Sequence, residues 1–109
     1  MESKKIEELS KKIRREVLAM VYQSKSGHLG CSLGIVDILL TLYFQVLRIN
    51  PKKPSLETRD RFLLSKGHAV SALYTVLAER GFFPKSLLSD YFKDGSKLAG
   101  HVTLGSLPG

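Results

Sequence analysis

A single short apolar run stands apart from the helical patterns around it. Residues 62–65, Phe-Leu-Leu-Ser, lie between Arg61 and Lys66-Gly67, and we expect them to form a buried strand. The other apolar patterns are helical. One strand by itself cannot satisfy its backbone N–H and C=O groups. The chain is therefore expected to fold beside strands from another copy or from further polypeptide.

The first helical pattern covers residues 4–24, where apolar side chains recur at spacings of three and four. This stripe consists of Ile6, Leu9, Ile13, Val17 and Met20 or Val21. The basic residues lie mostly off the stripe, as on a solvated helix face. Gly27 predicts the stop, because glycine is the usual residue just past a helix end.

The second helix is expected over residues 32–46, with Ser32 as its cap. Apolar side chains cover nearly all of its circumference, so it should be buried on most sides. A chain of 109 residues has little material with which to surround such a helix. This observation also favours a partner or more chain.

The second half contains less helix. After a loop around Asn50-Pro51, a third helix is expected over 68–80, stopped by Gly81. A short helix over 87–92, capped by Ser86, should follow. From Lys93 onward periodicity ends and glycines punctuate a long loop, a length that indicates function or disorder.

Composition narrows the class of protein. The length suits one domain, and 43% hydrophobic residues suffice for a core. Cys31 is the single cysteine, so no intramolecular disulfide can form and a cytoplasmic location is the default. No signal-peptide core is present, and the apolar stretch 33–47 is interrupted by Asp37 and too short to span a membrane. We therefore expect no membrane association.

The net charge of +7 leaves three interpretations open. An ordinary basic surface is the plainest, because net charge bears on solubility rather than on fold. Nucleic-acid binding is disfavoured, since the basic residues are dispersed among acids and no known motif is present. An anionic small molecule is the third, and the histidines favour it.

All three histidines, His28, His68 and His101, directly follow a glycine. Glycine permits a tight turn or a close approach to a ligand, and the next imidazole then stands at an open edge. We expect the three to converge on one polar ligand as proton-handling groups. Lys66, Gly67 and His68 follow the predicted strand and open a helix, where a phosphate or diphosphate binds in α/β proteins.

Other site chemistries find less support. A three-histidine zinc site lacks the short ligand spacing that anchors a pair on one element, because the separations are 40 and 33 residues. Cys31 lies three residues from His28, but neighbours in sequence need not face each other. Asp90 and Asp94 fit surface acids better than an acid–base pair. Neither a P-loop nor a Gly-x-Gly-x-x-Gly motif occurs.

Together these motifs resemble the N-terminal, thiamine-diphosphate-binding part of a transketolase, from about Ile13 onward. The matching residues are Ser26-Gly27-His28-Leu29-Gly30, Ser32-Leu33-Gly34 with Asp37, the block Arg59 to Ala69, Tyr74, Gly100-His101 and Pro108-Gly109. The central block Arg59 to Ala69 is highly specific. The 1-deoxyxylulose-phosphate synthases differ around it, whereas the dihydroxyacetone synthases stay close alternatives.

The resemblance implies roles for particular residues. His28 and His101 would hydrogen-bond the donor ketose and relay protons as its carbon–carbon bond breaks. His68, with Lys66 and Gly67, would lie near the cofactor diphosphate. The parent enzyme would move a two-carbon ketol unit between sugar phosphates of the pentose phosphate pathway, because the cofactor carries the carbanion chemistry and the protein supplies orientation and protons.

The resemblance also implies a partner. Leu29 and Val102 stand where many members have proline, and leucine at the first of these is similar to the split, two-subunit transketolases. The Gly-Asp-Gly…Asn motif that holds magnesium is absent from these 109 residues. We expect a single, incomplete N-terminal segment of an α/β fold, mostly helical with at most one or two short strands. It should work in a homo- or hetero-oligomer with a C-terminal subunit or further chain, and be inactive alone.

A rival hypothesis is a non-catalytic helical module that assembles with a partner chain. The apolar character of residues 32–46 motivates it. Size-exclusion chromatography with light scattering separates the possibilities, because a well-behaved monomer argues against a required partner.

Overall fold

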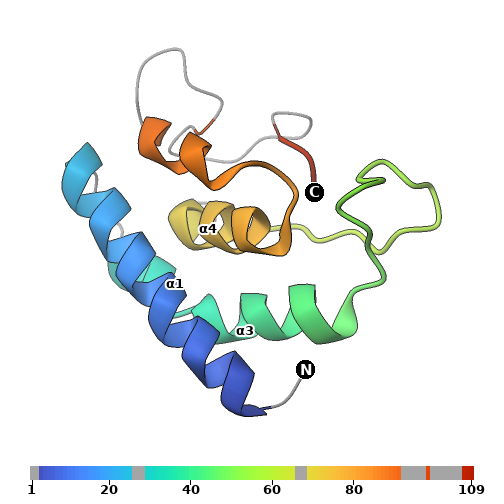
Figure 1. The fold of residues 1–109 in the computed structure, drawn as a ribbon, viewed down its shortest axis with the longest axis horizontal. Coiled ribbons are helices and arrows are strands. Elements are labelled where there is room, and N and C mark those ends of the chain that lie inside the picture. The colour runs from blue at the N-terminus through green and yellow to red at the C-terminus, as the bar shows by residue number, and fades with distance from the viewer. Residues whose placement is uncertain (1–2, 26–28, 66–68, 92–97, 99–106) are drawn as a thin grey trace.

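The amphipathic stripe predicted over 4–24 forms helix α1 (Ser3–Ser24), as expected. The computed structural model describes residues 3–25, 29–65, 69–91, 98 and 107–109. The described helices α1, α3, η1 and η3 surround α4 (Figure 1). The side of α1 that faces this core carries Ser10, Ile13, Val17, Met20 and Val21.

The predicted helix 32–46 is divided into three shorter elements. Helix α2 (Leu29–Leu33) begins earlier than expected, α3 (Val36–Thr41) follows, and η1 (Leu42–Val46) is a π-helical turn. The break falls at Gly34, where helix propensity is low, and at Ile35, whose φ of −115° and ψ of 3° lie outside the helical region. The expected cap at Ser32 is wrong, because this residue lies inside α2 and is buried.

The same stretch is less enclosed than its composition predicts. Val36, Leu39, Leu40 and Tyr43 are at most 2% exposed and face the core. Ile38 and Val46 remain 60% and 58% exposed. Burial on most sides is therefore contradicted for this chain: α3 and η1 present an apolar face to solvent.

The loop between η1 and the expected strand is closed by one ion pair. Asp60 Oδ2 accepts from the backbone N–H of Arg48 at 2.6 Å, and the Asp60 N–H donates to the Arg48 carbonyl at 2.9 Å. The guanidinium of Arg48 donates to Oδ1 at 3.1 Å. Hydrogen bonds from the Arg48 side chain and backbone hold the pKa of Asp60 below its ordinary value. The acidic residue of the block Arg59 to Ala69 thus fixes the loop that precedes the expected strand.

The expected strand at 62–65 is not formed in the described part of the chain. Phe62 and Leu64 are half-buried against the core, while Leu63 between them is 86% exposed. Such alternation is typical of a strand, but the described residues supply no neighbouring strand to complete its hydrogen bonds. Over these residues the chain is helix and loop, in agreement with the expected mostly helical piece of an α/β fold.

Helix α4 (Val70–Arg80) occupies the centre, with the blue-to-green α1 and α3 on one side and the orange η3 on the other (Figure 1). The sequence predicts a helix over 68–80 and an inner stripe, but every side chain from Val70 to Ala78 is buried. Gly81 ends the helix as predicted, in the left-handed region at φ 105°. Arg80 in the last turn donates to the carbonyl of Tyr43 at 2.9 Å and ties α4 to η1.

The remaining elements cover the other side of α4. The short helix expected over 87–92 is a 3-10 helix, η3 (Lys85–Asp90), and Pro84 rather than Ser86 precedes it without a side-chain cap. Leu98 is 1% exposed and Leu107 is half-buried against the core. The predicted loop from Lys93 lies mostly outside the described residues.

Candidate functional site

The five predicted site residues lie outside the described residues: His28, Lys66, Gly67, His68 and His101. The structure does describe what flanks them. Helix α1 ends before the first histidine and α2 begins after it. Ser65 and Ala69 flank the second segment, and the third runs between Leu98 and Leu107. The described flanks therefore define where each segment leaves and rejoins the core.

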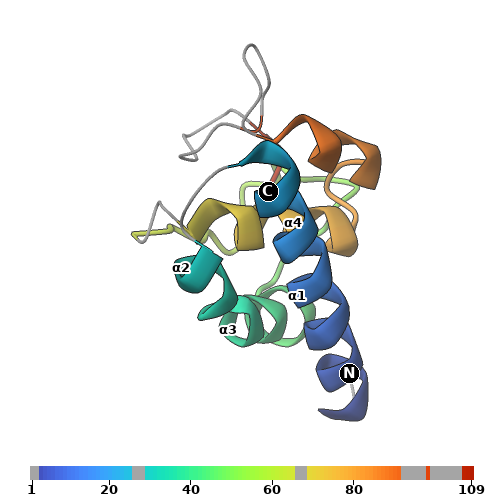
Figure 2. The ribbon, with the colours of Figure 1, turned by 90° about the vertical axis from the view of Figure 1, so that its left-hand side faces the viewer.

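The flanks of the first two segments meet at a buried contact between α2 and α4. Ser32 in α2 and Ser71 in the first turn of α4 share a hydrogen bond between their hydroxyl oxygens. Both side chains are wholly buried, at 0% and 1% exposure. Figure 2 shows α2 beside the yellow N-terminal turns of α4. Helices that follow two different glycine–histidine pairs are thus joined near their beginnings.

A second buried hydroxyl connects this junction to α1. Thr75 Oγ1, one turn after Ser71, donates to the Ser71 carbonyl at 2.8 Å and lies 3.2 Å from the sulfur of Met20. Met20 is in the last two turns of α1, the helix that precedes the first glycine–histidine pair. The three helices bordering the first two segments are consequently held together by one small group of buried polar contacts.

The third segment is attached to the core on both sides. Leu98, three residues before His101, is almost completely buried among the core residues. Leu107 packs against the same core from the other side of the segment. Gly109 follows with φ 88°, and a side chain there would come within 2.8 Å of the Phe82 ring. This tight approach requires glycine at the position.

Tyr74, part of the matching motif, is an internal residue. Its side chain is fully buried and its ring meets that of Tyr91 edge to face, with centroids 5.9 Å apart. Burial, with a smaller contribution from Tyr91, raises the pKa of Tyr74 to about 12. Its hydroxyl therefore stays neutral over the physiological range, and the residue anchors α4 in the core.

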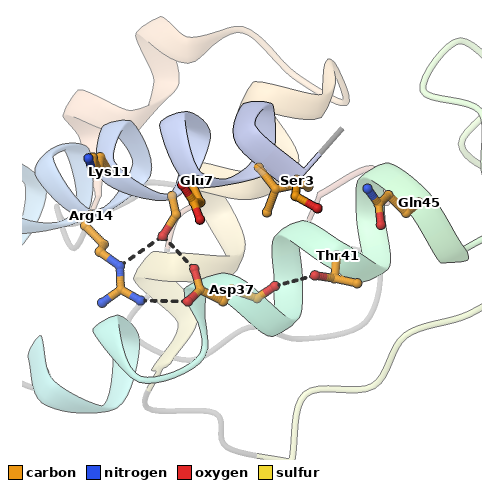
Figure 3. A pocket seen from close by; sticks show the side chains of 9 residues that line it. Ser3, Glu7, Lys11, Arg14, Asp37, Thr41 and Gln45 are labelled. Atoms are coloured by element: carbon orange, nitrogen blue, oxygen red, sulfur yellow. Dashed lines mark hydrogen bonds and ion pairs between the residues drawn. The ribbon is translucent and has the colours of Figure 1, made fainter. Parts of the chain in front are cut away.

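A polar groove of about 560 Å³ lies between α1 and the α3–η1 stretch (Figure 3). Asp37 accepts a hydrogen bond from Ser10 Oγ at 2.5 Å and from the Arg14 guanidinium at 3.2 Å. Arg14 Nε also donates to Ser10 at 3.1 Å. These groups satisfy one another, so Asp37 of the matching motif clamps α3 to α1. Sequence reasoning placed Asp37 in the motif but gave no sign of this structural contact.

Metal and nucleophile chemistry find no new support in the described residues. Within them, no group of three or more His, Cys, Asp or Glu side chains is placed to hold a metal ion. Cys31 is half-buried in α2, and Asp90 is exposed at the end of η3. Among the helices that the structure describes, none is long and apolar enough to cross a bilayer.

Comparisons with known proteins agree with the motif pattern. A family model described as "Transketolase, thiamine diphosphate binding domain" matches residues 6–109. One of the two subunits named for apulose-4-phosphate transketolase in Phocaeicola vulgatus is 39% identical over 109 residues, 100% of this chain and 38% of its own length. A 6-deoxy-6-sulfo-D-fructose transketolase subunit of Clostridium sp. is 40% identical over 92 residues, 84% of this chain and 34% of its own. A transketolase of Aquifex aeolicus is 40% identical over 109 residues, 98% of this chain and 16% of its own.

The chain belongs to the thiamine-diphosphate-binding, N-terminal transketolase family. Two of these relatives are subunits by name, which agrees with the similarity to split transketolases that Leu29 indicates. The chain spans between about a sixth and two fifths of the length of these three relatives.

Proposed function

We propose that residues 1–109 form the first part of a larger thiamine-diphosphate-binding domain in a transketolase that moves a two-carbon ketol unit between sugar phosphates. The single observation that carries this is the family match over residues 6–109, which includes all three glycine–histidine pairs. The joined flanks of the first two pairs support a common site, because Ser32 and Ser71 meet inside the core.

The proposed roles follow the chemistry of imidazole. His28 and His101 hydrogen-bond the donor ketose and pass protons to and from its hydroxyl groups, since an imidazole titrates near neutral pH. His68, with Gly67 and Lys66, contacts the cofactor diphosphate, where a cation and backbone N–H groups suit the negative charge. Thiamine diphosphate, when bound, supplies the stabilised carbanion that the chemistry requires.

The magnesium of the family is proposed to bind outside these residues. No Gly-Asp-Gly…Asn motif occurs in the 109 residues, and the described residues offer no cluster of acidic or histidine ligands. The described part of this chain therefore contributes no ligands to the metal in the proposal. It contributes the segments that face the cofactor and the sugar.

Further polypeptide is part of the proposal. Residues 61–65 alternate between half-buried and exposed side chains, and Leu63 is the most exposed large apolar residue of the described chain. Strands from the part of the relatives that this chain does not span would pair with this segment and complete an α/β sheet. We propose that the isolated chain is inactive and that the assembled enzyme is a cytoplasmic oligomer.

A chimera tests the proposed function. Residues 1–109 replace the matching part of the Phocaeicola vulgatus protein, and ketol transfer is measured with thiamine diphosphate, magnesium and the complementary subunit. The chimera should be active, whereas the isolated chain should not. His28→Ala and His101→Ala should each lower kcat by about 10²- to 10⁴-fold. His68→Ala should raise the cofactor concentration needed for half-maximal activity.

Ser89→Ala, in the exposed part of η3, serves as the control and should retain full activity. Histidine variants that keep normal kcat and normal cofactor dependence in a folded, active chimera would contradict the proposed roles. A chimera that assembles with its partner but transfers no ketol unit would favour the non-catalytic interaction module instead.

A further inference from the structure

Ser32 and Ser71 form a polar contact in the part of the core where α2 and α4 meet. Both side chains are almost completely inaccessible, and their hydroxyls hydrogen-bond to each other. Burying a hydroxyl is unfavourable unless it finds a partner, so each serine depends on the other for its place in the core. An apolar pair would tolerate sliding between the helices, whereas a hydrogen bond fixes one alignment.

The rest of the junction shows why such a fixed contact matters. Helix α2 has only five residues, and the break at Gly34-Ile35 separates it from α3. Helix α4 is already held to α1, because Thr75 contacts Met20. The element that needs alignment is therefore α2, and Ser32 is its one fully buried residue.

We propose that Ser32 and Ser71 are positioning residues, whose hydrogen bond sets the spacing between His28 and His68. Ser32 follows His28 by four residues, and Ser71 follows His68 by three. A shift of α2 along α4 would change the distance between the two attached segments. The catalytic consequence rests on the proposed function, but the structural consequence does not.

The first test uses the isolated chain and does not involve catalysis. The chain has three histidines, so its imidazole C–H cross-peaks in ¹H–¹³C spectra are few and assignable by single His→Gln substitutions. Ser32→Ala and Ser71→Ala should each move the His28 and His68 peaks by more than a linewidth. The double variant should shift them no further than either single variant, because one hydrogen bond is lost in all three.

Ser10→Ala is the matched control. Ser10 is also a buried serine that joins two helices, through its hydrogen bond to Asp37 between α1 and α3. Its loss should leave the His28 and His68 peaks in place even if the melting temperature falls. If an alanine variant does not fold, Ser71→Cys replaces it, because a thiol retains most of the volume and weakens the hydrogen bond.

The second test uses the active chimera. Ser32→Ala and Ser71→Ala should each lower kcat by about tenfold with an unchanged KM for the donor sugar, while Ser10→Ala leaves both values as they are. Folded Ser32 and Ser71 variants with unmoved histidine peaks would overturn the proposal. An inactive unmodified chimera would instead defeat the proposed function, and the spectra of the isolated chain would still decide the positioning role.

Discussion

Glu79 is the residue at which three elements are joined by charge. Its Oε1 accepts from Lys12 of α1 at 2.9 Å and from Lys85 of η3 at 2.8 Å. Partial burial raises the pKa of Glu79, but the hydrogen bonds from Lys85 and Lys12 together lower it by more, so the pKa lies below its ordinary value of 4.5. The carboxylate form is therefore favoured in the folded chain.

We predict that Glu79→Gln lowers the free energy of unfolding by about 1 kcal/mol at pH 7, because both charge-assisted hydrogen bonds weaken. A depressed folded pKa stabilises the chain above the unfolded value of 4.5, and this contribution is lost as pH falls through the folded pKa. The difference between variant and parent should thus shrink below pH 4.5. Urea denaturation at several pH values measures it, with Glu57→Gln in the exposed loop as the control. A difference that is constant down to pH 2 would contradict the assignment.

At the scale of the element, Gly81 decides where α4 ends. Its N–H lies 3.1 Å from the carbonyl oxygens of Leu77 and Ala78, and the following N–H of Phe82 reaches the Leu77 carbonyl at 3.0 Å. These bonds satisfy carbonyls that the end of a helix leaves open. They require the left-handed conformation at φ 105°.

Gly81→Ala should lower the free energy of unfolding by about 1 kcal/mol through backbone strain. An added Cβ would lie 3.7 Å from Pro51, an ordinary contact, so a steric clash contributes nothing. Gly30→Ala is the control, because this glycine is inside α2 and a Cβ there meets nothing within 4 Å. Thermal denaturation should show a lower midpoint for the first variant only, and equal midpoints would argue against strain.

The unpaired segment 61–65 makes a prediction of the opposite kind. Leu63 is 86% exposed, so Leu63→Lys should change the stability of the isolated chain by less than about 0.5 kcal/mol. In the chimera the same charge would enter the proposed sheet and should reduce soluble, assembled enzyme. Leu56→Lys, in the turn-rich loop and 44% exposed, should be harmless in both settings. Gel filtration of the chimeras checks this, and normal assembly of the Leu63 variant would count against strand pairing.

For the whole molecule, one core holds the described elements together. Residues from α1, α3, η1, α4 and η3, together with Leu98, belong to a single buried cluster. A domain of this size is stable by only about 5–15 kcal/mol, so a single cavity in the cluster removes a large share. The face formed by Ile38 and Val46 lies outside this core and stays exposed.

Leu40→Ala and Ile38→Ala test that division within one helix. Leu40 is 0% exposed, and its truncation should lower the free energy of unfolding by about 3 kcal/mol through lost contacts and a cavity. Ile38 is 60% exposed, and its truncation should cost less than about 0.5 kcal/mol in the isolated chain. Chemical denaturation of both variants provides the measurement, and similar losses would mean that α3 packs differently.

Features with local signals could be predicted from the amino-acid sequence without coordinates. The stripe of 4–24 and the stop at Gly81 are of this kind, because apolar periodicity and backbone freedom act over a few residues. The family was also accessible from sequence, since the motifs around His28, His68 and His101 are specific. Their roles stay predictions, because these residues lie outside the described part of the chain.

Features that depend on distant partners required the packed helices. The break at Gly34, the exposure of Ile38 and the unpaired state of 62–65 follow from which neighbours are present, and a periodic pattern does not encode that. The Ser32–Ser71 contact joins residues 39 positions apart. Burial and hydrogen bonding are properties of pairs of groups in space, so they become visible only when the helices are packed together.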